Sequence, residues 1–260
     1  MIVKINLMQK ILLFILVLLP VSIFSQTKKV KFISRTTSES GIFLSSNGSL
    51  SASALSLNQY WGVGKRKKNF KFGLGARLTS SFGGSSLEYI TAPAILTSGQ
   101  TGPGVFFADQ QPKNIDTLSL NSTQINSLNA YLALRYDFAK KWGIEFNIDL
   151  AGISLGGSKS ASLQYGDGTS NNKTSNAKPT FGNVLLISDN DLGSLNSEFL
   201  VSYKIKPKLK IKAGASFLFN EYTLSSPVKY INTAGTTIDT DRYRTKAFMF
   251  GLGINYIFTK

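Results

Sequence analysis

The 260-residue chain contains no cysteine and no histidine. Without cysteine it can form no disulfide, thiolate nucleophile or thiolate metal site. Without histidine it lacks imidazole zinc sites, the Ser-His-Asp and Cys-His nucleophile systems, and histidine acid–base catalysis. These absences remove most hydrolase and metalloenzyme chemistry, so we expect no enzyme and no catalytic, cofactor-binding or metal-binding residues.

Acidic residues are also scarce. The 14 Asp and Glu stand against 29 Lys and Arg, which gives a formal net charge of +15. Such an excess is typical of proteins that meet nucleic acid or a charged membrane surface. Because the basic residues gather in short turns, as described below, we expect a membrane and no nucleic acid.

The first 25 residues have the pattern of a cleaved signal peptide. Lys4 and Lys10 precede the apolar run ILLFILVLLPVSIF, and Ser25 precedes Gln26 at a plausible cleavage point. The alternative is an uncleaved anchor, but Pro20 interrupts the run, which is shorter than the roughly 20 residues of a spanning helix. We therefore expect a signal peptide over 1–25, a short N-terminal periplasmic segment over 26–39, and one domain over 40–260.

Long helical periodicity is missing as well, and period two replaces it. Large apolar residues alternate with small or polar ones in eight stretches, which predicts eight β-strands. The last of them, KAFMFGLGINYIFTK, places Phe248, Phe250, Leu252, Ile254, Tyr256 and Phe258 on one face. The other stretches are SGIFLSS, ALSLNQYWGVG, FKFGLGARL, LNAYLALRYDF, WGIEFNIDL, SLNSEFLVSYKI and LKIKAGASFLF. Asn47-Gly48 predicts a tight hairpin turn.

The connections between these stretches alternate in length and charge. Those at 64–69, 139–142 and 206–208 are short and basic, whereas those at about 84–126, 158–193 and 224–243 are long and rich in Ser, Thr, Asn and Gly. Short turns at one end and long loops at the other are the pattern of bacterial outer-membrane barrels. The basic end is expected to face the inner leaflet, where anionic headgroups attract it.

In these alternating strands the chain resembles the small outer-membrane β-barrel families, the OmpA-like and OmpX-like eight-stranded group, over about residues 40–260. The resemblance implies an all-β fold: an eight-stranded antiparallel transmembrane up-and-down barrel with long outer loops. It also implies that the last strand carries the assembly signal of such proteins, on Phe250, Leu252, Ile254, Tyr256 and Phe258.

The interior of a barrel this narrow is filled by its own side chains. Glycines on the inward row, such as Gly73 and Gly75, leave room for long neighbours, and charged residues of both signs share that row. We expect a lumen charge network formed by Lys71, Arg77, Arg135, Asp137, Glu145, Asp149, Glu198, Lys204, Lys210 and Lys212. The alternatives are a narrow polar channel and a carboxylate-pair active site on Glu145 and Asp149.

For function, the sequence favours a structural or surface-interaction barrel acting through its outer loops. A narrow porin or transport channel for small solutes and an accessory barrel of a secretion system stay open. The expected partners are outer-membrane lipids, the outer-membrane assembly machinery and a possible extracellular or secretion-system protein, with the chain a monomer. Aromatic residues in the expected loops could bind a partner or cap the barrel mouth: Tyr89, Phe106, Phe107, Tyr165 and Tyr230.

Overall fold

A computed structural model of the chain describes residues 33–64, 69–100, 107–166, 173–186, 191–231 and 237–258. The expected signal peptide, 1–25, and residues 65–68 lie outside these ranges. The described residues form one antiparallel sheet of thirteen strands. The eight expected stretches correspond to the long strands β1 (Ile33–Ser46), β2 (Leu50–Val63), β3 (Phe70–Gly83), β6 (Thr123–Tyr136), β7 (Trp142–Leu155), β11 (Leu195–Lys206), β12 (Leu209–Ile231) and β13 (Thr237–Phe258).

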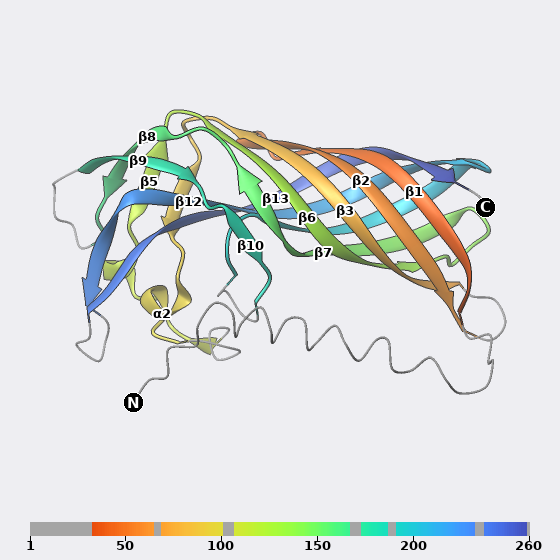
Figure 1. Cartoon of the computed structure of the whole chain (residues 1–260), viewed down its shortest axis with the longest axis horizontal. Helices are drawn as coiled ribbons and strands as arrows, with labels where there is room; N and C mark the ends of the chain where they lie inside the picture. The colour runs from red at the N-terminus through yellow and green to blue at the C-terminus, as the bar shows by residue number, and fades with distance from the viewer. Residues whose placement is uncertain are drawn as a thin grey trace. The chain divides into compact units, whose positions relative to one another are not determined.

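The long strands close a ring, visible in Figure 1 as a barrel of tilted strands. β1 pairs with β2 and β13, and the circuit continues through β3, β6, β7, β11 and β12 back to β13. Starting at Phe258 and following paired residues once round the ring leads to Phe248, ten residues earlier in β13. The intermediate partners are Ser38, Gln59, Leu74, Leu132, Ile148, Ser197 and Phe217. The strands are therefore tilted, and paired rows climb around the wall.

The alternation in the sequence sets which side chains face inward. In β7 the polar row of Glu145, Asn147 and Asp149 is buried, whereas Trp142 and Phe146 are exposed on the outer face. A bulge interrupts the register between Ala130/Tyr131 of β6 and their partners in β7. It reverses the parity of β7, so that odd-numbered residues face outward after it. The expected outward orientation of the large apolar row is confirmed.

The short turns share one end of the barrel, called the turn end below. There β2 meets β3, β6 meets β7 and β11 meets β12. The β1–β2 hairpin turns at the opposite end. Its Asn47 side chain accepts from the backbone N–H groups of Ser49 and Leu50, and Gly48 has φ of 91°, which favours glycine. β1 begins at Ile33, within the segment 26–39 that the sequence analysis placed ahead of the barrel.

The three long connections lie at this opposite end, as expected, and they are largely folded. They contain five further strands and extensions of β12 and β13. The five strands are β4 (Glu88–Thr91), β5 (Thr117–Leu120), β8 (Lys159–Gln164), β9 (Lys173–Pro179) and β10 (Gly182–Val184). β4, β5, β8 and β9 pair in sequence between the upper parts of β13 and β12, which also pair with each other. A second, smaller ring, called the cap below, therefore stands on the barrel.

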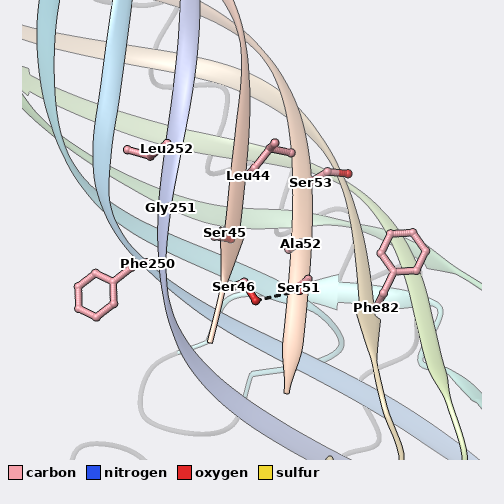
Figure 2. Close-up of a pocket in the computed structure, with 10 residues that line it drawn as sticks. All are labelled: Leu44, Ser45, Ser46, Ser51, Ala52, Ser53, Phe82, Phe250, Gly251 and Leu252. Atoms are coloured by element: carbon pink, nitrogen blue, oxygen red, sulfur yellow. Dashed lines mark hydrogen bonds between the residues drawn. The ribbon is translucent and has the colours of Figure 1, made fainter. Parts of the chain in front are cut away.

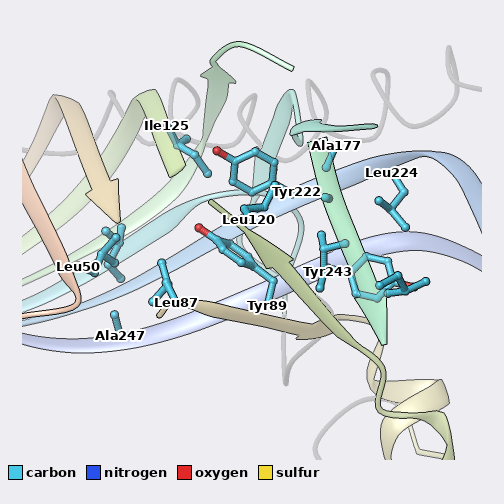
Figure 3. Close-up of a cluster of buried hydrophobic side chains, with 14 of the residues drawn as sticks. Leu50, Leu87, Tyr89, Leu120, Ile125, Ala177, Tyr222, Leu224, Tyr243 and Ala247 are labelled. Carbon is cyan, nitrogen blue, oxygen red and sulfur yellow. The ribbon is translucent and has the colours of Figure 1, made fainter. Parts of the chain in front are cut away.

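The cap encloses its own apolar core, shown in Figure 3. Tyr89, Tyr222 and Tyr243 point inward from β4, β12 and β13, and the rings of Tyr89 and Tyr222 meet edge to face at 5.2 Å. Leu118 and Leu163 complete the centre and are fully buried. Burying a leucine side chain fully stabilises a fold by about 1.5–3 kcal/mol. This core holds the short cap strands together, since isolated short strands are only marginally stable.

Two short helical turns complete the cap region: α2 (Ala94–Thr97) and η3 (Pro112–Asn114). Leu96 of α2 is buried in the apolar core, and Asn114 of η3 donates to the Leu96 carbonyl oxygen at 3.1 Å. Among the residues that the structure describes, no helix has the length and apolar character needed to cross a membrane.

The folded cap predicts which lysines a protease reaches first. Lys159 and Lys229 lie in paired strands, whereas Lys113 lies exposed in the η3 turn. Proteases bind an extended segment, so a paired strand must open locally before it is cut. Brief trypsin treatment of folded protein, followed by mass spectrometry, should show cleavage after Lys113 well before cleavage after Lys159 or Lys229. Equal cleavage rates at the three sites would contradict a folded cap.

Candidate functional site

The barrel interior nearest the turn end holds a buried group of charges, called the lower cluster: Glu39, Arg135, Glu145, Lys210 and Lys212. Glu145 contacts the Nζ atoms of Lys212 at 2.5 Å and Lys210 at 3.2 Å. Glu39 contacts Lys210 Nζ at 2.5 Å and Arg135 at 2.9 Å. Each carboxylate thus lies between two cations, and each of the five residues is at most 5% exposed.

The lower cluster reaches solvent through a further pair. Arg135 Nε donates to Asp137 at 2.6 Å, and Asp137 also meets Lys71 Nζ at 2.9 Å, with both of these side chains about one-fifth to one-quarter exposed. Lys204 stands apart. It is half-buried opposite Lys210 in the register and makes no ion pair with any side chain in the described ranges.

Further along the interior lies the middle cluster, centred on Arg77. Its guanidinium contacts Asp149 at 2.5 Å and Glu198 at 2.6 Å, with all three side chains buried. Amide groups hold these carboxylates from the other side. Asn129 donates to Asp149 at 2.8 Å, and Asn147 donates to Glu198 at 2.9 Å. Because Glu145 and Asp149 belong to different clusters and each is engaged by cations, they do not form the isolated carboxylate pair of a glycosidase-like site.

Two tyrosines fill the space between these clusters. The Tyr60 and Tyr131 rings lie where a side chain at Gly73 or Gly75 of β3 would be, so each ring needs a glycine opposite it. Tyr131 donates to Asn58 and lies 4.8 Å from the Arg77 guanidinium, within cation–π range. The long neighbours for which the inward glycines of β3 leave room are therefore aromatic rings.

At the junction of barrel and cap lies the upper cluster of Glu221, Arg242 and Arg244. Glu221 accepts from Arg242 Nε at 2.7 Å and from Arg244 at 2.8 Å. Both arginines also donate to the backbone carbonyl oxygen of Asp191. The segment from Asp191 to Asn196 thereby crosses the interior: the Ser194 carbonyl accepts from Asn129, and the Asn196 carbonyl accepts from Arg77.

Inside the cap, polar groups are fewer and mostly phenolic. The Tyr230 hydroxyl donates to Asp116 at 2.5 Å and lies 3.1 Å from the Tyr243 hydroxyl. Burial raises the pKa of Tyr230, with Tyr243 and the Asp116 hydrogen bond acting in the same direction. Burial likewise raises the pKa of Tyr243 and of Tyr89. The Tyr230 and Tyr243 hydroxyls stay neutral, and their contacts hold the two rings in the inward orientation.

The aromatics expected in the loops fall into different environments. Tyr89 and Tyr230 belong to the cap core and Tyr165 packs against it, whereas Phe107 is 92% exposed. Phe106 lies outside the described residues. The residues of the expected assembly signal, Phe250, Leu252, Ile254, Tyr256 and Phe258, all lie on the outer face of β13 and are exposed. Their reading as an assembly signal stays a prediction.

Several interior residues escaped the sequence analysis. Glu39 precedes the strand boundary set at residue 40, although it belongs to the inward row of β1. Arg242 was assigned to a loop, and Glu221 and Arg244 were not singled out, because the continuation of β12 and β13 into the cap was missed. Within the described ranges no group of three or more acidic side chains is arranged to hold a metal ion.

The chain matches no protein-family model and no curated protein sequence. Solved structures similar to it include Neisserial surface protein A, at 12% identity over 86% of this chain and 96% of that one, with a TM-score of 0.27. Ail, the attachment invasion locus protein of Yersinia pestis, was solved in complex with the heparin analogue sucrose octasulfate. It is 11% identical over 86% of this chain and 98% of that one, with a TM-score of 0.31. A major outer membrane protein of Thermus thermophilus is 11% identical over 86% of this chain and 100% of that one, with a TM-score of 0.38. The fold assignment rests on the strand pairings of this chain and not on these similarities.

Proposed function

We propose that this chain is an exported protein of a bacterial outer membrane. Its transmembrane part is the ring of eight long strands. The cap projects outward from the membrane, and the basic turn end faces the periplasm. The interior is plugged, so the protein acts as a structural or surface-interaction barrel rather than as a channel or an enzyme. It is a monomer that reaches the membrane through a signal peptide and the assembly machinery.

The observation that carries this proposal is a continuous apolar wall of the right height. The ten-residue stagger, roughly 33 Å at about 3.3 Å per residue, spread over eight strands about 4.8 Å apart, corresponds to a tilt of about 40°. The outward row of β13 runs from Phe248 to Phe258. At that tilt its ten residue steps rise by about 25 Å, which is the height of the apolar band of outer-membrane barrels.

The residue composition of the wall changes at both of its borders. At the turn end the Trp142 and Tyr203 rings contact each other in a tilted arrangement with centroids 4.7 Å apart, and Tyr256 meets Phe258 at 5.2 Å. Aromatic residues gather at membrane interfaces because their rings are apolar and their polar atoms reach water. Toward the cap end the outward rows of β1, β2 and β3 include the serines Ser46, Ser51 and Ser80.

The filled interior supports a non-conducting role. Seven interior cations meet six carboxylates in direct ion pairs, so none of these six carboxylates is left free to select a permeating cation. They are Lys71, Arg77, Arg135, Lys210, Lys212, Arg242 and Arg244 against Glu39, Asp137, Glu145, Asp149, Glu198 and Glu221. Above them the apolar cap core covers the mouth. The outer surface of the cap is then the part of the protein that a partner outside the cell would meet.

Single-channel recording tests the plugged interior. In planar bilayers the wild-type protein should give no steady conductance steps. The double variant Arg77→Ala, Tyr131→Ala removes two central interior side chains and should give small steps if the cap leaks, whereas the outward-facing control Phe199→Ala should remain silent. Steady steps from the wild-type protein would overturn the plugged barrel in favour of a narrow channel.

Electrophoretic migration tests the membrane location. Folded barrels of this kind keep their shape in detergent until heated, so unheated and boiled samples should migrate differently. Urea-unfolded protein should recover the unheated form only when detergent or phospholipid vesicles are present. Refolding to a soluble monomer in buffer alone would contradict the proposed membrane wall.

A further inference from the structure

The outer wall carries a hollow of about 530 Å³ beside the β1–β2 hairpin, shown in Figure 2. Its two side walls are Phe250 of β13 and Phe82 of β3, and both rings project outward. The floor between them consists of short side chains, among them Ser51, Ala52 and Gly251. The hollow lies within the size range of small-molecule sites in proteins, about 300–1,000 Å³.

The polarity of the lining changes from one end of the hollow to the other. Toward the turn end its border is formed by Leu44 and Leu252, which are 58% and 69% exposed on the outer face. Toward the cap end lie the hydroxyls of Ser46 and Ser51, which hydrogen-bond to each other at 2.8 Å. Ser53 stands beside Leu44 in the register. One end therefore fits hydrocarbon, and the other offers hydroxyl groups.

The height of the hollow along the barrel axis agrees with this change from apolar to hydroxyl lining. Phe250 pairs with Ser46, Ser46 with Ser51, and Ser51 with Phe82. Because paired rows climb around the wall toward the cap end, each residue in this series stands about 3 Å higher than the previous one at a tilt of about 40°. The hollow therefore spans the upper border of the apolar band, where hydrocarbon gives way to the polar part of a lipid.

From this geometry we propose that the hollow binds one acyl chain of an outer-leaflet lipid, with the chain's carbonyl group at the serine hydroxyls. The inference rests on the proposed membrane location. The acyl chain lies along Leu44 and Leu252, between the rings of Phe82 and Phe250. Phe250 is held in place by an edge-to-face contact with Phe248 at 5.1 Å. An ester or carboxyl oxygen accepts a hydrogen bond from the Ser53 hydroxyl, because Ser46 donates to the Leu50 carbonyl oxygen and Ser51 then donates to Ser46. A detergent tail has no oxygen that could accept this bond.

Tryptophan fluorescence tests the site with a defined probe. In a background with Trp61→Phe and Trp142→Phe, a single reporter is placed in the hollow by Phe82→Trp. A matched reporter, Leu155→Trp, lies on β7 at the same border and is likewise exposed. Phosphatidylcholine with brominated acyl chains, added at low mole fraction to protein in detergent micelles, quenches tryptophan on contact. The reporter at position 82 should be half-quenched at a lipid fraction at least tenfold lower than the reporter at position 155.

Filling the hollow should abolish the difference. Ser53→Phe in the Phe82→Trp background should make its quenching match that of the position-155 reporter, whereas Ser40→Phe, outside the hollow on the outer face, should change nothing. Unbrominated fatty acid should compete with the brominated lipid for the hollow, whereas glycerophosphocholine should not. This comparison separates recognition of the acyl chain from recognition of the headgroup. Every variant is first checked for heat-modifiable migration.

The outcomes separate the two proposals. Equal quenching of both reporters would overturn the lipid site and leave the membrane wall intact. If neither reporter were quenched in vesicles made entirely of the brominated lipid, the membrane location itself would fail. Preferential quenching accompanied by a dimer that Ser53→Phe disrupts would also overturn the lipid site, because a second copy of the chain would then fill the hollow.

Discussion

Glu145→Gln is expected to lower the free energy of unfolding by about 3–5 kcal/mol, the loss typical of removing one partner from a buried ion pair. Glu145 is 1% exposed and contacts Lys212, Lys210 and, at 3.8 Å, Arg135. Glutamine keeps the shape but removes the charge. Three buried cations then remain in the lower cluster with Glu39 as their only fully buried carboxylate.

The measurement is urea unfolding in phospholipid vesicles, followed by loss of the heat-modifiable form. Glu88→Gln is the matched control, because Glu88 is exposed on β4 and the chemical change is the same. It should alter stability by no more than about 0.5 kcal/mol. Adding Lys212→Met to Glu145→Gln should restore part of the loss, since one uncompensated cation is removed with its partner. Equal midpoints for Glu145→Gln and Glu88→Gln would show that the lower cluster does not stabilise the barrel.

The long strands could be predicted from sequence because their alternation is sustained. In β6 and β7 a buried polar row and an exposed apolar row persist for several residues, which a helix cannot accommodate. The placement of Arg77 opposite Asp149 could not be deduced in the same way. It depends on the ten-residue stagger, which brings residues from non-adjacent strands to one level and emerges only once the ring is closed.

The cap was missed for a different physical reason. β4 and β5 are four residues long, and a pattern such as Glu88–Thr91 contains too few alternations to separate strand from loop. Their stability comes from long-range pairing, as between Ile90 and Arg244, and from the core around Tyr89 and Leu118. Alternation is present, since Tyr89 and Thr91 face inward, but it becomes meaningful only when the partner strands are known.

Glu39 shows how one boundary error hides an interior residue. The stretch before Gly41 reads as polar, because Ser38, Glu39 and Ser40 lack the large outward residue that marks the other strands. In the structure these residues pair with Phe258, Ile257 and Tyr256 of β13, which supply the apolar neighbours. A charged residue whose parity matches the inward row of the following strand is the signal that could have extended β1.

Leu252→Arg is expected to destabilise the protein by about 2–4 kcal/mol in lipid, the cost of an arginine near the midplane on the lipid-facing side of a barrel. Leu252 lies midway along the outward row from Phe248 to Phe258 and is 69% exposed on the protein's outer face. The substitution removes no buried interior contact, so the loss should arise from lipid rather than from packing. The prediction therefore tests whether hydrocarbon or water surrounds the outer wall of the barrel.

Comparing two environments separates these contributions. Gln124→Arg is the matched control, because Gln124 is exposed on β6 beyond the apolar band and should tolerate the same side chain within about 0.5 kcal/mol. Unfolding midpoints of both variants are measured in phospholipid vesicles and in small micelles, where water and detergent headgroups reach the guanidinium more easily. The penalty for Leu252→Arg should be largest in vesicles and shrink in micelles. If Leu252→Arg lowered the free energy of unfolding in vesicles as little as Gln124→Arg does, the outer row of β13 would not face hydrocarbon. An arginine held at the middle of the membrane loses most of its hydration, and this loss is energetically costly.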